Sequence, residues 1–133
     1  MIKLLAMAAT AGAVAVLLAA PAGAASSSSV GCPAAQPLTH NATAAAARAA
    51  LAEAPGLYQG IDTTGEYVVS STPAPQAGPR GEQIGLECGQ RTEDRSVVVE
   101  LHFPAMEPSA SLSQGIVFVS RVHGQYTVWQ VAH

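Results

Sequence analysis

The stretch Arg95-Ser96-Val97-Val98-Val99-Glu100-Leu101-His102-Phe103 decides how the rest of the chain is arranged. From Val97 onward the side chains alternate between two faces: Val97, Val99, Leu101 and Phe103 on one, Val98, Glu100 and His102 on the other. Because successive side chains of a strand point in opposite directions, this alternation predicts a strand with one buried face. A charged segment precedes it and Pro104 follows it, so we expect the central strand of a small antiparallel sheet.

Two further segments upstream have the pattern of strands. Glu66–Thr72 is rich in β-branched and aromatic residues, which strands favour. Gln83–Gly89 would place Ile84, Leu86 and Cys88 on one face and Glu87 on the other. Between them, Pro73–Gly81 carries three prolines and two glycines and is predicted to be a loop. Arg91–Asp94 is predicted to be the turn that leads into the central strand.

The end of the chain has the pattern of a β-hairpin. Ile116–Val122 and Gln125–Val131 flank His123-Gly124, which is predicted to be a two-residue turn. This register pairs Ile116 with Val131, Phe118 with Trp129, and Ser120 with Thr127. The opposite face of the hairpin is half apolar, so we expect it to be an outer face, open to a protein partner or a second copy of the chain. It consists of Val117, Val119, Val128, Arg121, Tyr126 and Gln130. The segment Pro104–Gly115 before the hairpin is predicted to be a long loop.

A helix is predicted near the amino end of the folded part. Ala42–Ala54 contains nine alanines, the best helix formers, with Thr39 or Asn41 as its cap. Pro55-Gly56 is expected to end it. Small side chains allow a helix to approach a sheet closely. The sequence therefore predicts an α+β domain over residues 39–133, with one N-terminal helix packed on a four- or five-stranded antiparallel meander.

The first 25 residues have the three parts of a secretory signal peptide. A basic start at Lys3 is followed by an apolar run over residues 4–20 and then by the small residues Ala22-Gly23-Ala24-Ala25. We therefore expect an exported, secreted protein. A retained membrane anchor is the alternative, although 17 mostly small residues are marginal for about 30 Å of hydrocarbon. Residues 26–38, rich in serine, alanine and proline, are expected to form a flexible lead-in.

The chain has two cysteines, Cys32 and Cys88. An even number in an exported chain predicts a disulfide between them. One alternative is a lipid anchor on Cys32, but the serine run 26–29 separates this residue from the apolar segment that lipidation signals adjoin. The other is a reactive thiol, for which the Cys-x-x-Cys spacing of redox pairs is missing.

The charge of the exported part argues against two classes of partner. Removal of residues 1–25 leaves five arginines and nine acidic residues, a net charge of −4. Nucleic-acid binding needs a basic patch, and these scattered arginines do not form one. A basic amphipathic helix, the usual signature of membrane-surface binding, is also missing from the sequence.

Glu100 and His102 are the strongest candidates for chemistry because they share the polar face of the central strand. Such a pair could act as an acid and a base, or as two metal ligands. A solvated strand face gives the same pattern, and a metal site needs three or four ligands. His40, His123 and His133 do not complete one at ligand spacing. The sequence lacks Gly-x-Ser-x-Gly, and Gly78-Pro79-Arg80-Gly81 lacks the lysine of a phosphate loop. We therefore predict no catalytic residue, metal or cofactor.

The C-terminal stretch Gln114–His133 resembles the last hairpin of cystatin-like and NTF2-like folds, in which a helix also precedes a curved sheet. Gln114-Gly115-Ile116-Val117 does not match the inhibitory Gln-x-Val-x-Gly of cystatins. The pocket acids and histidines of NTF2-like enzymes cannot be placed on this sequence. The chain as a whole resembles small exported actinobacterial proteins of unknown function.

Three functions from different classes are consistent with these features. The first is an exported, non-enzymatic binding or interaction module that uses the half-apolar sheet face as its contact surface. The second is a small enzyme with a pocket between helix and sheet, using Glu100, His102 or Glu87. The third is a secreted protease inhibitor that presents the loop Ser109–Ser113.

Overall fold

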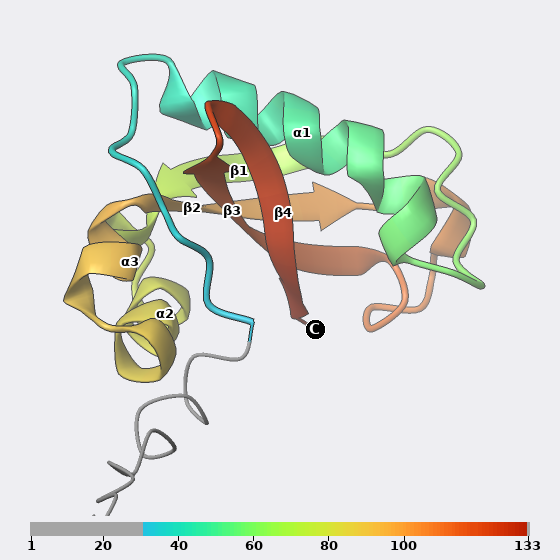
Figure 1. Ribbon diagram of the computed structural model, residues 1–133. Helices are drawn as coiled ribbons and strands as arrows, with labels where there is room; N and C mark the ends of the chain where they lie inside the picture. The colour runs from blue at the N-terminus through green and yellow to red at the C-terminus, as the bar shows by residue number, and fades with distance from the viewer. Residues whose placement is uncertain (1–30, 133) are drawn as a thin grey trace, which may run out of the picture.

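Four antiparallel strands in chain order form the centre of the molecule, which we describe from a computed structural model over residues 31–132 (Figure 1). The sheet order is β1-β2-β3-β4, so the strands form a meander. The α+β class and the antiparallel sheet are thereby confirmed. The predicted signal peptide and residues 26–30 lie outside the described residues. The elements of the described part are α1 (Ala42–Leu57), β1 (Tyr67–Pro73), η1 (Ala74–Gln76), α2 (Pro79–Cys88), α3 (Gln90–Asp94), β2 (Ser96–His102), η2 (Pro104–Met106), β3 (Gln114–Val122) and β4 (Gln125–Ala132).

Helix α1 forms where the alanine-rich segment predicts it and covers one face of the sheet. Its buried residues recur every four positions: Ala42, Ala46, Ala50 and Ala54. This spacing places them in a single row along the helix, and their small side chains bring the helix axis close to the strands. The helix continues past its predicted end to Leu57, because Pro55 lies in the last turn, which the Tyr58 N–H closes onto the Ala54 carbonyl at 3.0 Å.

The main core lies between α1 and what we call the inner face of the sheet. Strand β2 contributes its predicted apolar face, and the segment that follows it contributes Phe103. Fully or nearly fully buried members from the strands are Val97, Val99, Leu101, Val117 and Val119. Burial of one such side chain stabilises a fold by about 1.5–3 kcal/mol, so this layer is the principal source of stability.

The two faces of the C-terminal hairpin are reversed relative to the prediction. In the sheet, Val97 pairs with Val119 and Val99 with Val117, so these four side chains share the inner face. The valine face that we expected to be open to a partner is therefore buried under α1. The hairpin pattern alone could not decide this, because a shift of one residue between β2 and β3 exchanges every side chain between faces.

The predicted hairpin register holds near the turn and fails beyond it. Ser120 pairs with Thr127 as expected, but Phe118 pairs with Gln130 and not with Trp129. The shift arises at a β-bulge between Phe118 and Val119, where Trp129 is the additional residue on β4. The bulge allows both Val128 and Val131, which are an odd number of residues apart, to pack against the inner core. The Phe118 and Trp129 rings still make contact, with centroids 5.6 Å apart.

The segment Gln83–Gly89, predicted to be a strand, belongs to helix α2. The predicted loop Pro73–Gly81 contains η1 and the first turn of α2, and the predicted turn Arg91–Asp94 lies in the short helix α3. The prediction of a single helix was therefore wrong. Helix signals are present in the sequence: Pro79 starts α2, Glu82 lies in its first turn, and Gly89 follows its last residue with a φ of 89°.

Helix α2 and η1 cover part of the second, outer face of the sheet, opposite α1 (Figure 1). Ile84 of α2 and Ala74 of η1 pack against Val98 and Phe118, which form a second, smaller buried cluster. Leu86, which the strand interpretation had buried beside Ile84, is 89% exposed, since two residues of a helix at this spacing point in different directions.

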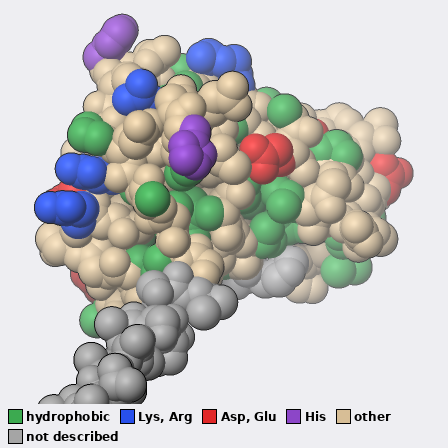
Figure 2. All heavy atoms as spheres, viewed as in Figure 1, with side chains coloured by type: hydrophobic (Ala, Val, Ile, Leu, Met, Phe, Trp, Pro, Cys, Tyr) green, Lys and Arg blue, Asp and Glu red, His purple; other side chains and the backbone are tan. Residues whose placement is uncertain are grey.

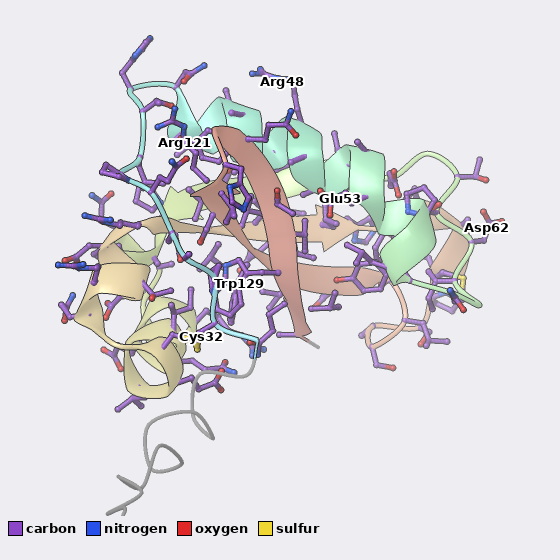
Figure 3. All side chains as sticks on the ribbon, in the orientation of Figure 1. Cys32, Arg48, Glu53, Asp62, Arg121 and Trp129 are labelled. Carbon is purple, nitrogen blue, oxygen red and sulfur yellow. A yellow bond between two sulfur atoms is a disulfide. The ribbon has the colours of Figure 1, made fainter. Side chains whose placement is uncertain are left out.

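The predicted disulfide is present and joins Cys32 to Cys88, the last residue of α2. Figure 3 shows Cys32 where the lead-in passes α2. Both alternatives for Cys32, a lipid anchor and a reactive thiol, are wrong because its sulfur is already bonded. In the chain-entropy treatment, a loop of this length corresponds to roughly 4 kcal/mol of stabilisation, which holds α2 and the lead-in together.

Gly81 and Gly85 of α2 offer a matched test of this helix assignment. A Cβ at Gly81 would collide with the backbone carbonyl of Ala74, which cannot move without displacing η1. We expect Gly81→Ala to lower the free energy of unfolding by about 1–3 kcal/mol, measured by urea denaturation.

Gly85→Ala is the control for that measurement. Its new Cβ would come closest to the carboxylate end of the flexible Glu93 side chain, which can swing away, while alanine improves helix propensity by about 0.5–1 kcal/mol. We expect a neutral or slightly stabilising effect. Equal destabilisation by both variants would contradict the packing of α2 on η1.

Tyr58 gives the core a measurable response to alkaline pH. Its side chain is 4% exposed, and burial raises the pKa of its phenol to about 12, from an ordinary value near 10. The neutral phenol is therefore favoured by folding, and its contribution to stability is complete below pH 10 and is lost as the pH rises toward 12.

In an ultraviolet titration of phenolate absorbance, we expect a late ionisation step with a pKa of about 12 from the Tyr58 phenol. Tyr58→Phe should remove this late step and leave the remaining titration unchanged. A late step that persists in Tyr58→Phe would assign the buried phenol to another residue.

Candidate functional site

The candidate site is the part of the outer sheet face that α2 leaves uncovered. Glu100 and His102 of β2 lie here, as their alternation with the buried residues predicts. Across the strands, Glu100 pairs with Ile116 and His102 with Gln114, so four outward side chains meet on neighbouring strands. The structure thus brings the two predicted residues to one surface and adds two from β3 that the sequence analysis did not single out.

A β-bulge in β1 directs a hydroxyl group toward Glu100. The pairing of β1 with β2 shifts between Val68 and Ser70, which leaves Val69 as the additional residue. As a result Val68 packs into the inner core, while the Ser70 hydroxyl donates a hydrogen bond of 3.0 Å to Glu100 Oε2. Val69 is 58% exposed and forms a rim beside the carboxylate. Bulges often re-aim a side chain in this way next to functional sites.

His102 is held by contacts on two sides. Its Nε2 lies 2.7 Å from Oε1 of Glu107, in the loop that follows η2. Its ring also contacts the ring of Tyr67, with centroids 5.2 Å apart. These contacts fix the imidazole against the edge of the sheet and attach the loop after β2 to the strand from which it departs.

These side chains surround a hollow of about 310 Å³. Its lining comes from the exposed bulge residue of β1 and from neighbouring segments of β2 and β3: Val69, Glu100, Leu101, His102, Gln114, Gly115 and Ile116. A volume of this size lies at the lower end of those that hold small molecules, and the mixture of apolar walls with a few polar groups is typical of such sites.

A second hollow of about 140 Å³ adjoins the first. The two share Gln114, Gly115 and Ile116, while the second is bounded by Arg80 of α2 and by Ala110 and Ser111 of the loop before β3. Together they form a groove across the sheet between α2 and this loop, which we call the outer groove. Gly115 cannot carry a side chain here, because a Cβ would lie 2.5 Å from the Tyr58 hydroxyl on the inner face.

The third residue proposed for chemistry, Glu87, does not join this site. It lies on α2, where one carboxylate oxygen accepts a hydrogen bond from Gln83 at 3.0 Å and the other accepts one from Gln130 at 3.4 Å. The expected pocket between helix and sheet was also wrong, because the alanine row of α1 fills that space. The hollow is on the opposite face.

The loop Ser109–Ser113, proposed as an inhibitor loop, is folded into turns. The Ser113 N–H donates to the Ser109 carbonyl at 3.0 Å, and the Ser113 carbonyl accepts from the Phe103 N–H at 2.8 Å. Ser113 is buried, whereas Leu112 is 46% exposed. The segment therefore forms one wall of the outer groove and is not an extended strand.

Charged side chains are spread over the surface without a large area of either sign on the face shown in Figure 2. Within residues 31–132, no group of three or more metal-binding side chains converges. In the same part of the chain, no helix has the length and hydropathy needed to cross a membrane.

Sequence reasoning missed several residues of this site, among them Arg80, Gln114 and Ser70, whose hydroxyl donates to Glu100. Ser70 could not be assigned to this face of the sheet, because no pattern in the strand predicts the bulge. Arg80 lay in a segment assigned to a loop, although Gly78-Pro79 ahead of it is a helix-start signal. Gln114 could have been found from the β2–β3 register, had the register been known.

No protein-family model, curated protein or solved structure matches this chain. The likeness of its C-terminal hairpin to cystatin-like and NTF2-like folds stays a prediction.

Proposed function

We propose that this protein is an exported binding module that takes a small ligand in the outer groove. The observation that carries the proposal is the hollow of about 310 Å³ into which Glu100 and His102 converge. Both side chains are held in place by neighbours, Ser70 for the carboxylate and Glu107 for the imidazole. Polar groups fixed before a ligand arrives lose little conformational entropy on binding, which favours affinity and selectivity.

The covered part of the outer face favours a small ligand over a broad protein interface. Helix α2 and η1 already bury Val98 and Phe118, which would otherwise be the apolar centre of a contact surface. A stable protein interface needs about 800 Å² on each partner. The uncovered area is instead hollowed and bounded on two sides, as sites for small molecules are.

Export is supported by two independent features. Residues 1–25 have the composition of a signal peptide, and Cys32 is joined to Cys88 by a disulfide, a bond that persists in oxidising compartments. Expression of the full chain in a secreting actinobacterial host should release protein whose N-terminus, read by mass spectrometry, lies between residues 23 and 27. Full-length protein that stays with the membrane would contradict the proposal.

The groove is tested by a nuclear magnetic resonance screen of the disulfide-bonded protein against a diverse set of small molecules. We expect hits to shift the amide signals of Glu100, Gln114 and Ile116 and to leave those of α1 unchanged. Glu100→Gln should weaken binding of the hits that contact the carboxylate by about tenfold, because hydrogen bonds to charged groups are the stronger ones.

The matched control is Glu82→Gln, which removes a carboxylate from the exposed side of α2 outside the outer groove. Its affinity for the same hits should equal that of the parent protein. Hits that gather on other surfaces, or a library with no hit in the groove, would reject the proposal.

A small enzyme is the second candidate, because Glu100 and His102 line one hollow and could serve as acid and base. The enzyme is distinguished from the binding module by whether the ligand is chemically changed during a long incubation with the protein. Ligands that bind and are recovered unchanged after long incubation support a binding module, whereas chemical conversion that is lost in both Glu100→Gln and His102→Gln supports the enzyme.

A further inference from the structure

We propose that the ligand of the outer groove is dipolar: a short peptide with free ends, whose ammonium group binds at Glu100 and whose carboxylate binds at Arg80. This inference rests on the proposed function and names the ligand class of the same site. It follows from the placement of opposite charges in the two adjoining hollows, one bounded by Glu100 and the other by Arg80.

The larger hollow is suited to a cationic group. Among the described residues, the only hydrogen bond to the Glu100 carboxylate comes from Ser70, at Oε2. A carboxylate can accept about four hydrogen bonds, so Oε1 retains its capacity for a donor. His102, on the same face of β2, directs its Nε2 to Glu107, so this ring nitrogen is engaged with Glu107 and not with Glu100.

The smaller hollow is suited to an anionic group. Arg80 lies in the first turn of α2 and lines this hollow together with Ser111, whose exposed hydroxyl adds a donor. A guanidinium group presents a planar set of donors that matches a carboxylate, which makes arginine the usual partner of carboxylate ligands.

The two hollows are joined by a neutral stretch formed by Gln114, Gly115 and Ile116. Ile116 supplies an apolar wall to both, and Val69 adds a second apolar rim at the Glu100 end. The Gln114 side chain is exposed and can donate and accept hydrogen bonds, as a peptide group requires. A ligand with a charge at each end, amide groups between them and a small apolar side chain has these features in the same order.

The test uses the tripeptide Ala-Leu-Ala in four forms: free at both ends, N-acetylated, C-amidated, and blocked at both ends. Calorimetry and amide-shift titration at neutral pH measure the affinity of each form for the disulfide-bonded protein. We expect the free peptide to bind best, and either block to weaken binding about tenfold or more, because each removes a hydrogen-bonded charge pair.

Variants assign each end of the peptide to its residue. In Glu100→Gln, N-acetylation should no longer matter while C-amidation still weakens binding. In Arg80→Gln the dependence should be reversed, and Arg80→Lys, which keeps the charge, should retain most of the preference for a free carboxylate. Glu82→Gln and Arg91→Gln, exposed residues of α2 and α3 outside both hollows, are the charge-matched controls.

The outcomes separate this inference from the proposed function. Four forms that bind within about threefold of each other, or a preference that survives in both Glu100→Gln and Arg80→Gln, would overturn the dipolar ligand. Peptides that fail to bind, while other small molecules occupy the groove, would overturn it too and leave the groove as a binding site. A groove that no compound perturbs would reject both.

Discussion

The close packing of α1 against the inner sheet face is the contact on which the rest of the structure depends. Four alanines in one row meet the valines of β2 and β3, and this contact decides which side of each strand is buried. Once Val97 and Val99 face the helix, Glu100 and His102 must face the other way, because strand side chains alternate. The placement of the polar pair is thus a consequence of how the core is packed.

Which part of the outer face is covered depends on helix α2, whose end is held in place by the disulfide. Helix α2 covers the sheet at Val98 and Phe118 and stops short of Glu100, so one face is divided into a packed part and an open part. The bond from Cys88 to Cys32 attaches the end of α2 to the lead-in. The lead-in is in turn tied to the sheet, where Gln36 pairs with Arg121. The boundary of the groove is therefore fixed by covalent and backbone contacts together.

The sequence allowed the main elements to be predicted wherever one residue type or one period dominated. The alanines of α1 and the alternation from Val97 to Phe103 are such cases, and Cys32 and Cys88 had no other partner within the chain. The prediction failed where two patterns competed. Ile84, Leu86 and Cys88 alternate like a strand, yet Pro79 and Gly89 bound a helix, and a ten-residue helix offers too few turns for its period to stand out.

The candidate site was predictable only in part for a related reason. Glu100 and His102 belong to the strand with the clearest pattern, so their shared face was evident from the sequence. The other polar residues of the site, Ser70, Gln114 and Arg80, depend on one bulge, one strand register and one helix that local sequence does not specify. Non-local pairing of this kind is set by the core as a whole, where a single step exchanges the two faces.

The bulge at Val69 has a consequence for how this fold can vary among chains. A chain that lacks this one residue could keep the same number of strands and the same helix packing beyond it. Its first strand would alternate regularly, because Val68 and Ser70 already pair with the successive residues Leu101 and Glu100, and the serine hydroxyl would stay beside the carboxylate while the apolar rim was lost. A single-residue deletion at the bulge is therefore informative: such a chain keeps the scaffold and the serine–carboxylate pair, and differs only in a hollow that is open on the side of β1.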